Sequence, residues 1–268
     1  MKKRNWYLTV GLILFAVMLA YTVLGFFWTP YQPDKLSGAT KYASPSLSHL
    51  FGCDHLGRDV FSRALDGAGT TLTIALAVLA VGFVFGLTLG ALCGYYGGVV
   101  DAVVMRICDA ITAFPSILLA MVVIAVIGTG TYNVVAALGI LFIPSFARLV
   151  RGEFIKYRDR DFVQAARLTG VSDFRIIFVH ILPNTWPVLL SGLTIGFNNA
   201  VLSEASMSYL SIGVGPGDAS LGRMLSEAQG YLFTAPWCTV FPALVVVLLI
   251  LGVGMIGEGI RERIGEGV

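Results

Sequence analysis

The chain has 268 residues, of which 56% are hydrophobic and only 13% are charged. Its mean hydropathy of +0.81 lies far outside the range of soluble globular proteins. The formal net charge of +2 is too small to indicate a nucleic-acid-binding protein. Apolar runs of about 20 residues are long enough to cross a hydrocarbon core as helices. The composition therefore predicts an all-α, polytopic membrane protein.

The first apolar run, from Trp6 to Trp28, predicts an uncleaved anchor and not a secretory signal. It is longer than the apolar part of a signal peptide (about 7–15 residues), and no small-residue cleavage site follows it. Five more runs follow along the chain. The six predicted spans cover residues 7–29, 72–96, 104–128, 131–150, 186–209 and 238–259. Pro115 and Pro144 lie inside the third and fourth spans, where we expect kinks and not breaks.

The distribution of lysine and arginine predicts the orientation of these spans. With the N-terminus inside, only five of the 18 basic residues lie outside: Lys35, Lys41, Arg58, Arg63 and Arg223. Because loops rich in Lys and Arg stay in the cytoplasm, both termini are predicted to be cytoplasmic.

This topology divides the chain into an N-terminal anchor, a loop, a core and a tail. We expect the anchor at 1–29, an extracytoplasmic loop at 30–71, a core of five helices at 72–260 and a cytoplasmic tail at 261–268. The core includes a cytoplasmic loop at 151–183 and an external loop at 210–236.

The second span carries a stripe of small residues at four-residue spacing: Gly82, Gly86, Gly90 and Gly94. Such a stripe lets another helix approach closely within a membrane. We favour packing inside this chain over a contact with another subunit.

The four cysteines show neither CxxC nor Cys/His metal spacing. Cysteine in an apolar helix behaves as a small hydrophobic residue. Cys53 and Cys238 are both predicted outside, so a disulfide between them is open.

The predicted cytoplasmic loop interrupts the apolar pattern with a charged, helix-forming stretch. We expect Asp161 to cap a short helix and Gly170 to form the turn that ends it. The apolar positions of this helix are Phe162, Val163, Ala165, Ala166 and Leu168. A second amphipathic segment follows Asp173, and Pro183 and Pro187 mark the return to the membrane. The apolar face must bury itself either at the lipid interface or in a groove of a partner protein, and composition leaves both open.

The same stretch resembles the EAA loop of ABC-transporter membrane subunits, which reads Glu-Ala-Ala, three residues, Gly and a hydrophobic-x-Leu-Pro end. Ala165, Ala166 and Gly170 fall in register, and "HILP" closes the pattern. Gln164 stands in place of the Glu and lacks its charge, and His180 replaces the usual hydrophobic residue. The resemblance implies contact with ATPase subunits through Phe162, Gln164, Ala165, Ala166, Leu168, Gly170 and Asp173.

A second motif narrows the resemblance. The segment "FGCDHLGRDVFSRALDGAGTTL" is similar to the G-x-D-x-L-G-R-D-x-x-S-R signature of the dipeptide/oligopeptide/nickel permeases, and "AFPSILLA", "ARLVRGE", "LSEASMSYLSIGVG" and "APW" also match. The chain most resembles the second of the two permease types. It departs locally, with "GPGDASLGRM" where many members carry a proline-rich segment.

This resemblance implies a subunit of a prokaryotic, binding-protein-dependent ABC importer in the cytoplasmic membrane. Its expected partners are a second permease subunit, two ATP-binding subunits, an extracytoplasmic solute-binding protein and membrane lipid, but no nucleic acid. The cargo would be a di- or oligopeptide or a nickel–chelator complex.

The chain itself offers no catalytic constellation and is not expected to be an enzyme. None of its five lysines follows a glycine, so a Gly-Lys-Ser/Thr phosphate loop is missing. We expect no cofactor here, with ATP and Mg on the partner ATPase subunits. A metal site of His49 and His55 with Cys53 or Asp54 is conceivable. We expect no metal, because these positions overlap a signature shared with peptide carriers.

Polar residues in the spans are candidates for the pathway. Asn198 and Asn199, near the middle of the fifth span, could bind a solute or another helix. Asp109 and Arg106, three residues apart, predict an ion pair on one helix. Glu204 is expected near the outer interface in a structural role.

The external segment "LGRMLSEAQGYL" predicts an amphipathic helix. Its apolar positions are Leu221, Met224, Leu225, Ala228 and Leu232. The resemblance implies docking of a solute-binding protein there, and the alternative is packing over the mouth of the bundle.

A different class of function stays open as the alternative: an autonomous secondary transporter or channel. It would need an intramembrane acidic or histidine relay, or an inverted repeat. Asp109 is the only acidic candidate well inside a predicted span, and no repeat is evident.

Overall fold

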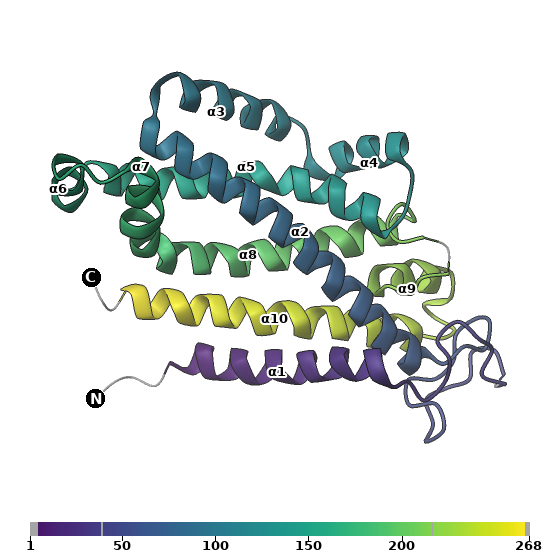
Figure 1. Cartoon of the computed structure of the whole chain (residues 1–268). Coiled ribbons are helices and arrows are strands. Elements are labelled where there is room, and N and C mark those ends of the chain that lie inside the picture. Colours follow the sequence, from purple (N-terminus) through teal and green to yellow (C-terminus); the bar gives the residue numbers. More distant parts are fainter. Residues whose placement is uncertain (1–4, 39, 216, 266–268) are drawn as a thin grey trace.

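The computed structural model describes residues 5–38, 40–215 and 217–265, and this part of the chain is almost entirely helical. Five long helices form a bundle, in which one helix, α2, crosses the others obliquely (Figure 1). They are α1 (Trp6–Phe27), α2 (Val60–Tyr96), α5 (Thr131–Arg158), α8 (Leu182–Tyr209) and α10 (Trp237–Gly265). All five are long and apolar enough to span a membrane, which confirms the predicted all-α membrane fold.

The third predicted span is not one kinked helix. Residues 104–128 instead belong to α3 (Gly98–Thr112) and α4 (Ser116–Ile127), which meet at an angle of 88°. Pro115 explains the break, because proline lacks an N–H group and its ring disfavours helical geometry at Phe114. The chain therefore has up to six spans among its described residues, with the third broken at Pro115.

The second span begins earlier than predicted, inside the expected loop 30–71. Asp59 caps α2 by accepting a hydrogen bond from the N–H group of Ser62 over 2.8 Å, so the helix starts at Val60 and not at residue 72. The polar side chains of Arg63 and Asp66 hide this first part of α2 from a hydropathy pattern.

The glycine stripe of α2 packs against α5, as predicted. A Cβ atom at Gly90 would lie 2.5 Å from the backbone oxygen of Ala147, and one at Gly94 would lie 2.5 Å from Cβ of Phe154. Gly139 of α5 accommodates Val81 of α2 in the same way, because its Cβ would lie 2.7 Å from Cγ1 of that residue. The two helices thus contact each other almost backbone to backbone, which fixes them as one unit.

The bundle has two ends, which we name by what lies there (Figure 1). The terminal end holds the start of α1, the end of α10, and the segment α6 (Asp161–Leu168), α7 (Asp173–Arg175) and η1 (Ile176–Ile181). The loop end holds residues 28–59, α9 (Leu221–Ala228) and η2 (Gln229–Tyr231). Lys2, Lys3, Arg4 and the last three residues of the predicted tail 261–268 lie outside the described residues.

The predicted amphipathic helix is present in part as α9, capped by Ser220, but it ends at Ala228, and Leu232 lies beyond it and is exposed. Leu221, Met224 and Ala228 are buried, so its apolar face lies on the bundle.

The two cysteines that were predicted outside the membrane do not form a disulfide. Cys53 and Cys238 are both free, and the thiol of Cys238 donates to the backbone oxygen of Cys53 over 3.4 Å.

Candidate functional site

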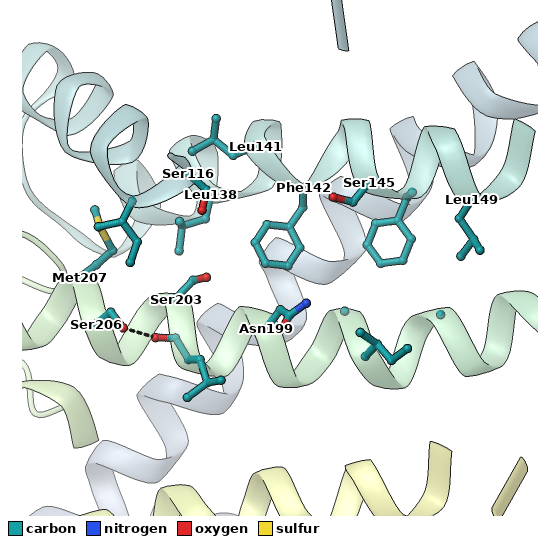
Figure 2. A pocket seen from close by; sticks show the side chains of 16 residues that line it. Ser116, Leu138, Leu141, Phe142, Ser145, Leu149, Asn199, Ser203, Ser206 and Met207 are labelled. Carbon is teal, nitrogen blue, oxygen red and sulfur yellow. Dashed lines mark hydrogen bonds between the residues drawn. The ribbon is translucent and has the colours of Figure 1, made fainter. Parts of the chain in front are cut away.

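A half-open cavity of about 520 Å³ lies between α5, α8 and the start of α4 (Figure 2). Its walls combine aliphatic and aromatic side chains with uncharged polar ones, and none of the described residues that line it is charged. The polar members are Ser116, Ser145, Asn199, Ser203 and Ser206. Such a lining can exchange hydrogen bonds with a polar solute without holding it through charge.

The two asparagines of α8, both predicted for the pathway, have different surroundings. Asn199 lines the cavity. Asn198 instead faces α10, with its Nδ2 atom 3.1 Å from the place of a Cβ at Gly254. Its buried Oδ1 atom has no hydrogen-bond partner among the described residues. Helical geometry explains the split, because adjacent residues on a helix point in directions about 100° apart.

The predicted ion pair of Asp109 with Arg106 is wrong. Asp109 accepts a hydrogen bond from Arg148 of α5 over 3.0 Å, and Arg148 also donates to Thr112 over 2.6 Å. The break at Pro115 lets α3 lie along α5, which brings Arg148 to this face. Both charged side chains are well exposed on this subunit.

The short helix α6 presents one face to the bundle and the other away from it. Val163 and Ala166 are buried, whereas Leu168 is 90% exposed and Phe162 is 40% exposed. Gln164 donates to the backbone oxygen of Asp159 over 3.0 Å, which holds the start of the helix. This leaves an apolar edge on α6 with no partner among the described residues.

The limits of α6 agree with the sequence prediction, except for its cap. Arg160 occupies the N-cap position, and Asp161 is the first helical residue. An acidic side chain in the first turn still stabilises the helix through its dipole. Gly170 has a φ of +78°, which confirms the predicted glycine turn.

The segment after this turn returns to the bundle without a separate start at the prolines. The π-helix η1 joins α7 to α8, so Pro183 lies in the first turn of α8 and Pro187 lies inside it. Asp173 of α7 is bound by two tyrosines at the end of α2. Tyr95 donates to it over 2.6 Å, and Tyr96 over 3.3 Å. Asp173 is among the site residues predicted from the sequence, but neither tyrosine is. The only feature of the sequence that could have indicated them is the pair "YY" at the end of an apolar run.

The loop end carries a network of charged side chains. Asp54 accepts hydrogen bonds from Arg58 over 2.7 Å and from Arg63 over 2.9 Å. Glu227 of α9 binds the same two arginines, over 2.8 Å and 2.9 Å. Burial raises the pKa of Glu227, but the charges of Arg63 and Arg58 and the bonds from Arg63 and Arg223 outweigh burial, so its pKa lies below the ordinary value.

This network also contains a group of potential metal ligands. The ligand atoms of Asp54, His55 and Glu227 lie within 4.8 Å of one another. Both carboxylates, however, are already neutralised by arginine, and Nδ1 of His55 shares a hydrogen bond of 2.6 Å with Tyr231. His49 is turned away from His55, toward Asp59, at 2.9 Å. These donors are therefore already engaged in ion pairs and hydrogen bonds with other side chains.

Glu204 is fully buried in α8 and accepts a hydrogen bond from Ser208 over 2.7 Å. Thr71 of α2, next to this region, accepts one from the N–H group of Leu221 over 3.3 Å. The first bond lies within α8 and the second joins α9 to α2, while Oε2 of Glu204 has no hydrogen-bond partner among the described residues.

Comparison with known proteins agrees with this architecture. The dipeptide transport system permease protein of Alkalihalophilus pseudofirmus is 36% identical over 98% of this chain and 86% of its own length. The glutathione transport system permease protein of Escherichia coli is 39% identical over 97% of this chain and 87% of its own length. A chain of the inward-facing MetNI methionine ABC transporter has the same fold, with a TM-score of 0.62, 21% identity, and coverage of 76% of this chain and 95% of that one.

The similarity to these permeases extends over nearly the whole chain, and the described helices have the fold of an ABC-importer permease. Residues 86–266, which include the cavity, α6 and α9, match the binding-protein-dependent transport system inner membrane components. This chain therefore belongs to that family, the membrane-embedded permease subunits of ABC importers.

Proposed function

We propose that this permease subunit forms half of a pathway for short peptides and that α6 couples it to separate ATPase subunits. The observation that carries the proposal is the divided surface of α6. Val163 and Ala166 anchor one face, while Leu168 on the other face is 90% exposed. An exposed leucine on an anchored helix suits insertion into an apolar groove of a partner protein.

In this arrangement the terminal end is cytoplasmic and the loop end is external, as the distribution of Lys and Arg predicts. The ATPase subunits bind ATP and Mg and meet Phe162, Gln164, Ala165, Leu168 and Gly170 of the α6 segment. Of the other two residues expected there, Ala166 is buried against the bundle and Asp173 is bound by Tyr95. A solute-binding protein docks at the loop end, on the side of α9.

The half-open cavity supports a heterodimer with a second permease. Its polar side chains face a space that this chain does not close alone, and a second subunit would supply the opposite wall. A peptide is preferred as cargo over a nickel–chelator complex, for two reasons. The similar proteins carry dipeptides and glutathione, and serine and asparagine side chains can pair with peptide groups.

The alternative, an autonomous transporter or channel, is less favoured. It would need an intramembrane acidic relay, and its main acidic candidate, Asp109, forms an ion pair with Arg148.

Purification of the chain from its native membrane in mild detergent tests the proposal. We expect ATPase subunits and a second permease to copurify. Leu168→Asp should lose the ATPase subunits but keep the second permease, because a carboxylate is costly in an apolar groove. Leu47→Asp, which changes a fully exposed leucine at the loop end, is the matched control and should keep both. A chain that purifies alone and moves solute without ATP would contradict the proposal.

A further inference from the structure

The segment that contains α6 and α7 is held to α2 by a compact set of polar contacts. Both oxygens of the Asp173 carboxylate are bound, Oδ1 by Tyr95 over 2.6 Å and Oδ2 by Tyr96 over 3.3 Å. Tyr95 is only 5% exposed, whereas Tyr96 is 53% exposed. The shorter and better shielded contact is therefore the one with Tyr95, and hydrogen bonds to a carboxylate are stronger than those between neutral groups.

Tyr95 also contacts the other side of the glycine turn. Nε of Arg167, in the last turn of α6, donates to the Tyr95 hydroxyl over 3.4 Å. The guanidinium of Arg167 lies over the Tyr95 ring, with Cζ 4.9 Å from the ring centre. One side chain of α2 thus binds both α6 and α7, which Gly170 separates in the chain.

These contacts give α6 a directional connection that its apolar face lacks. Val163 and Ala166 pack into a cluster that includes Phe154 and Ile176. Apolar packing of this kind is non-directional, so it does not by itself set the orientation of α6. A hydrogen-bonded carboxylate instead fixes both distance and angle.

The end of α2 is itself fixed to α5 beside Tyr95. The neighbouring residue, Gly94, lies against Phe154 of α5, where an added Cβ would be 2.5 Å from Cβ of Phe154. Further along the same interface, Gly86 lies against Phe146. Phe146 lines the cavity and also contacts Gly196 of α8. Packed helices of this kind move as one body, so a displacement of α2 at Tyr95 also displaces a wall of the cavity.

We propose that Tyr95 is a positioning residue for energy coupling, which fixes α6 and α7 to α2 so that movement of α6 shifts α2, α5 and the cavity wall together. This inference rests on the proposed function of α6 as the contact with ATPase subunits. It assigns to Tyr95 a role in the transfer of movement and none in the binding of ATPase subunits or cargo.

The test uses Tyr95→Phe in the assembled transporter, reconstituted in lipid vesicles with its binding protein and a dipeptide. The variant keeps the ring under Arg167 but removes the hydroxyl that contacts Asp173. The measured quantity is cargo imported per ATP hydrolysed. We expect the cargo imported per ATP to fall about tenfold. Loss of a hydrogen bond to a charged group changes an equilibrium constant by about this factor.

Tyr157→Phe is the matched control. Tyr157 is a partly buried tyrosine of α5 that packs against the same apolar cluster, and its hydroxyl has no partner among the described residues. Its removal should leave the import per ATP at the wild-type value. A merely structural role of Tyr95 would lower the yield or the melting temperature of the complex without changing that ratio.

Asp173→Asn and the double variant complete the experiment. If the two residues act as a pair, the double variant should be no worse than either single one. Asp173→Asn also replaces Tyr95→Phe if the latter reduces assembly, because Asp173 is exposed. An unchanged ratio in Tyr95→Phe, in a complex that imports cargo as wild type, would overturn this inference but leave the proposed function intact. Absence of ATPase subunits from the wild-type complex would overturn both.

Discussion

Arg63 of α2 donates to Glu227 of α9 over 2.9 Å, although 164 residues separate them in the chain. Arg63 also binds Asp54, and Arg58 binds both carboxylates. The network therefore joins the loop before α2, the start of α2 and α9. Since Arg63 is only 3% exposed, this part of the G-x-D-x-L-G-R-D-x-x-S-R signature forms the frame of the loop end.

Arg63→Ala should destabilise the protein strongly. The change leaves Asp54, itself 3% exposed, without one of its two cationic partners. Removal of one partner from a buried ion pair costs about 3–5 kcal/mol. Thermal unfolding in detergent checks this. Arg158→Ala, which breaks an exposed pair with Asp159, is the control and should cost no more than about 1 kcal/mol. Equal losses in the two variants would show that the network is not a frame.

The same network should weaken in acid. The pKa of Glu227 is lowered in the folded protein, so its ion pairs contribute their full stability above the ordinary pKa of 4.5. This contribution is lost as the pH falls through the lowered value, because the protonated carboxyl no longer attracts the arginines. Melting temperatures of wild type and Glu227→Gln should therefore differ at pH 7, and the difference should shrink as the pH falls below 4.5 and vanish once it has passed the lowered pKa. A difference that persists in acid would contradict this account.

Local signals in the sequence were sufficient to predict α6 and its turn. An acidic start, paired alanines and Gly170 lie within one short stretch, and each acts on its immediate neighbours. The same is true of the glycine stripe, whose spacing alone predicts close packing.

The partner of Asp109 was not predictable in this way. Asp109 pairs with Arg148 and not with Arg106 because α3 lies along α5, and this arrangement follows from the break at Pro115. A hydropathy pattern cannot distinguish a kinked span from two helices at 88°. Tyr95 was missed for a similar reason, because its contact with Asp173 joins residues 78 positions apart. Such contacts are properties of the packed bundle and not of any one segment.

Gly90→Ala should separate α2 from α5. The added Cβ would lie 2.5 Å from the backbone oxygen of Ala147 and 2.7 Å from Cβ of Val150, so one of the helices must shift. Overpacking of this kind costs about 1–3 kcal/mol. Gly152→Ala on α5 is the control, since nothing lies within 4 Å of its Cβ position. It should leave the melting temperature unchanged or raise it, because alanine favours helix formation. A loss of stability in the control alone would place the close contact elsewhere.

The two asparagines of α8 offer a matched pair for testing the cavity as a pathway. Asn199→Leu removes a polar group that lines the cavity, so peptide import should fall several-fold while the melting temperature stays at the wild-type value. Asn198→Leu removes a buried oxygen that has no partner among the described residues. Because an unpaired buried polar atom costs about 1–3 kcal/mol, this variant should keep import and be at least as stable as wild type. Import assays in vesicles and thermal unfolding of both variants check these outcomes. Loss of import in Asn198→Leu alone would place the pathway on the side of α8 that faces α10, because Asn198 and Asn199 differ in direction and not in chemistry.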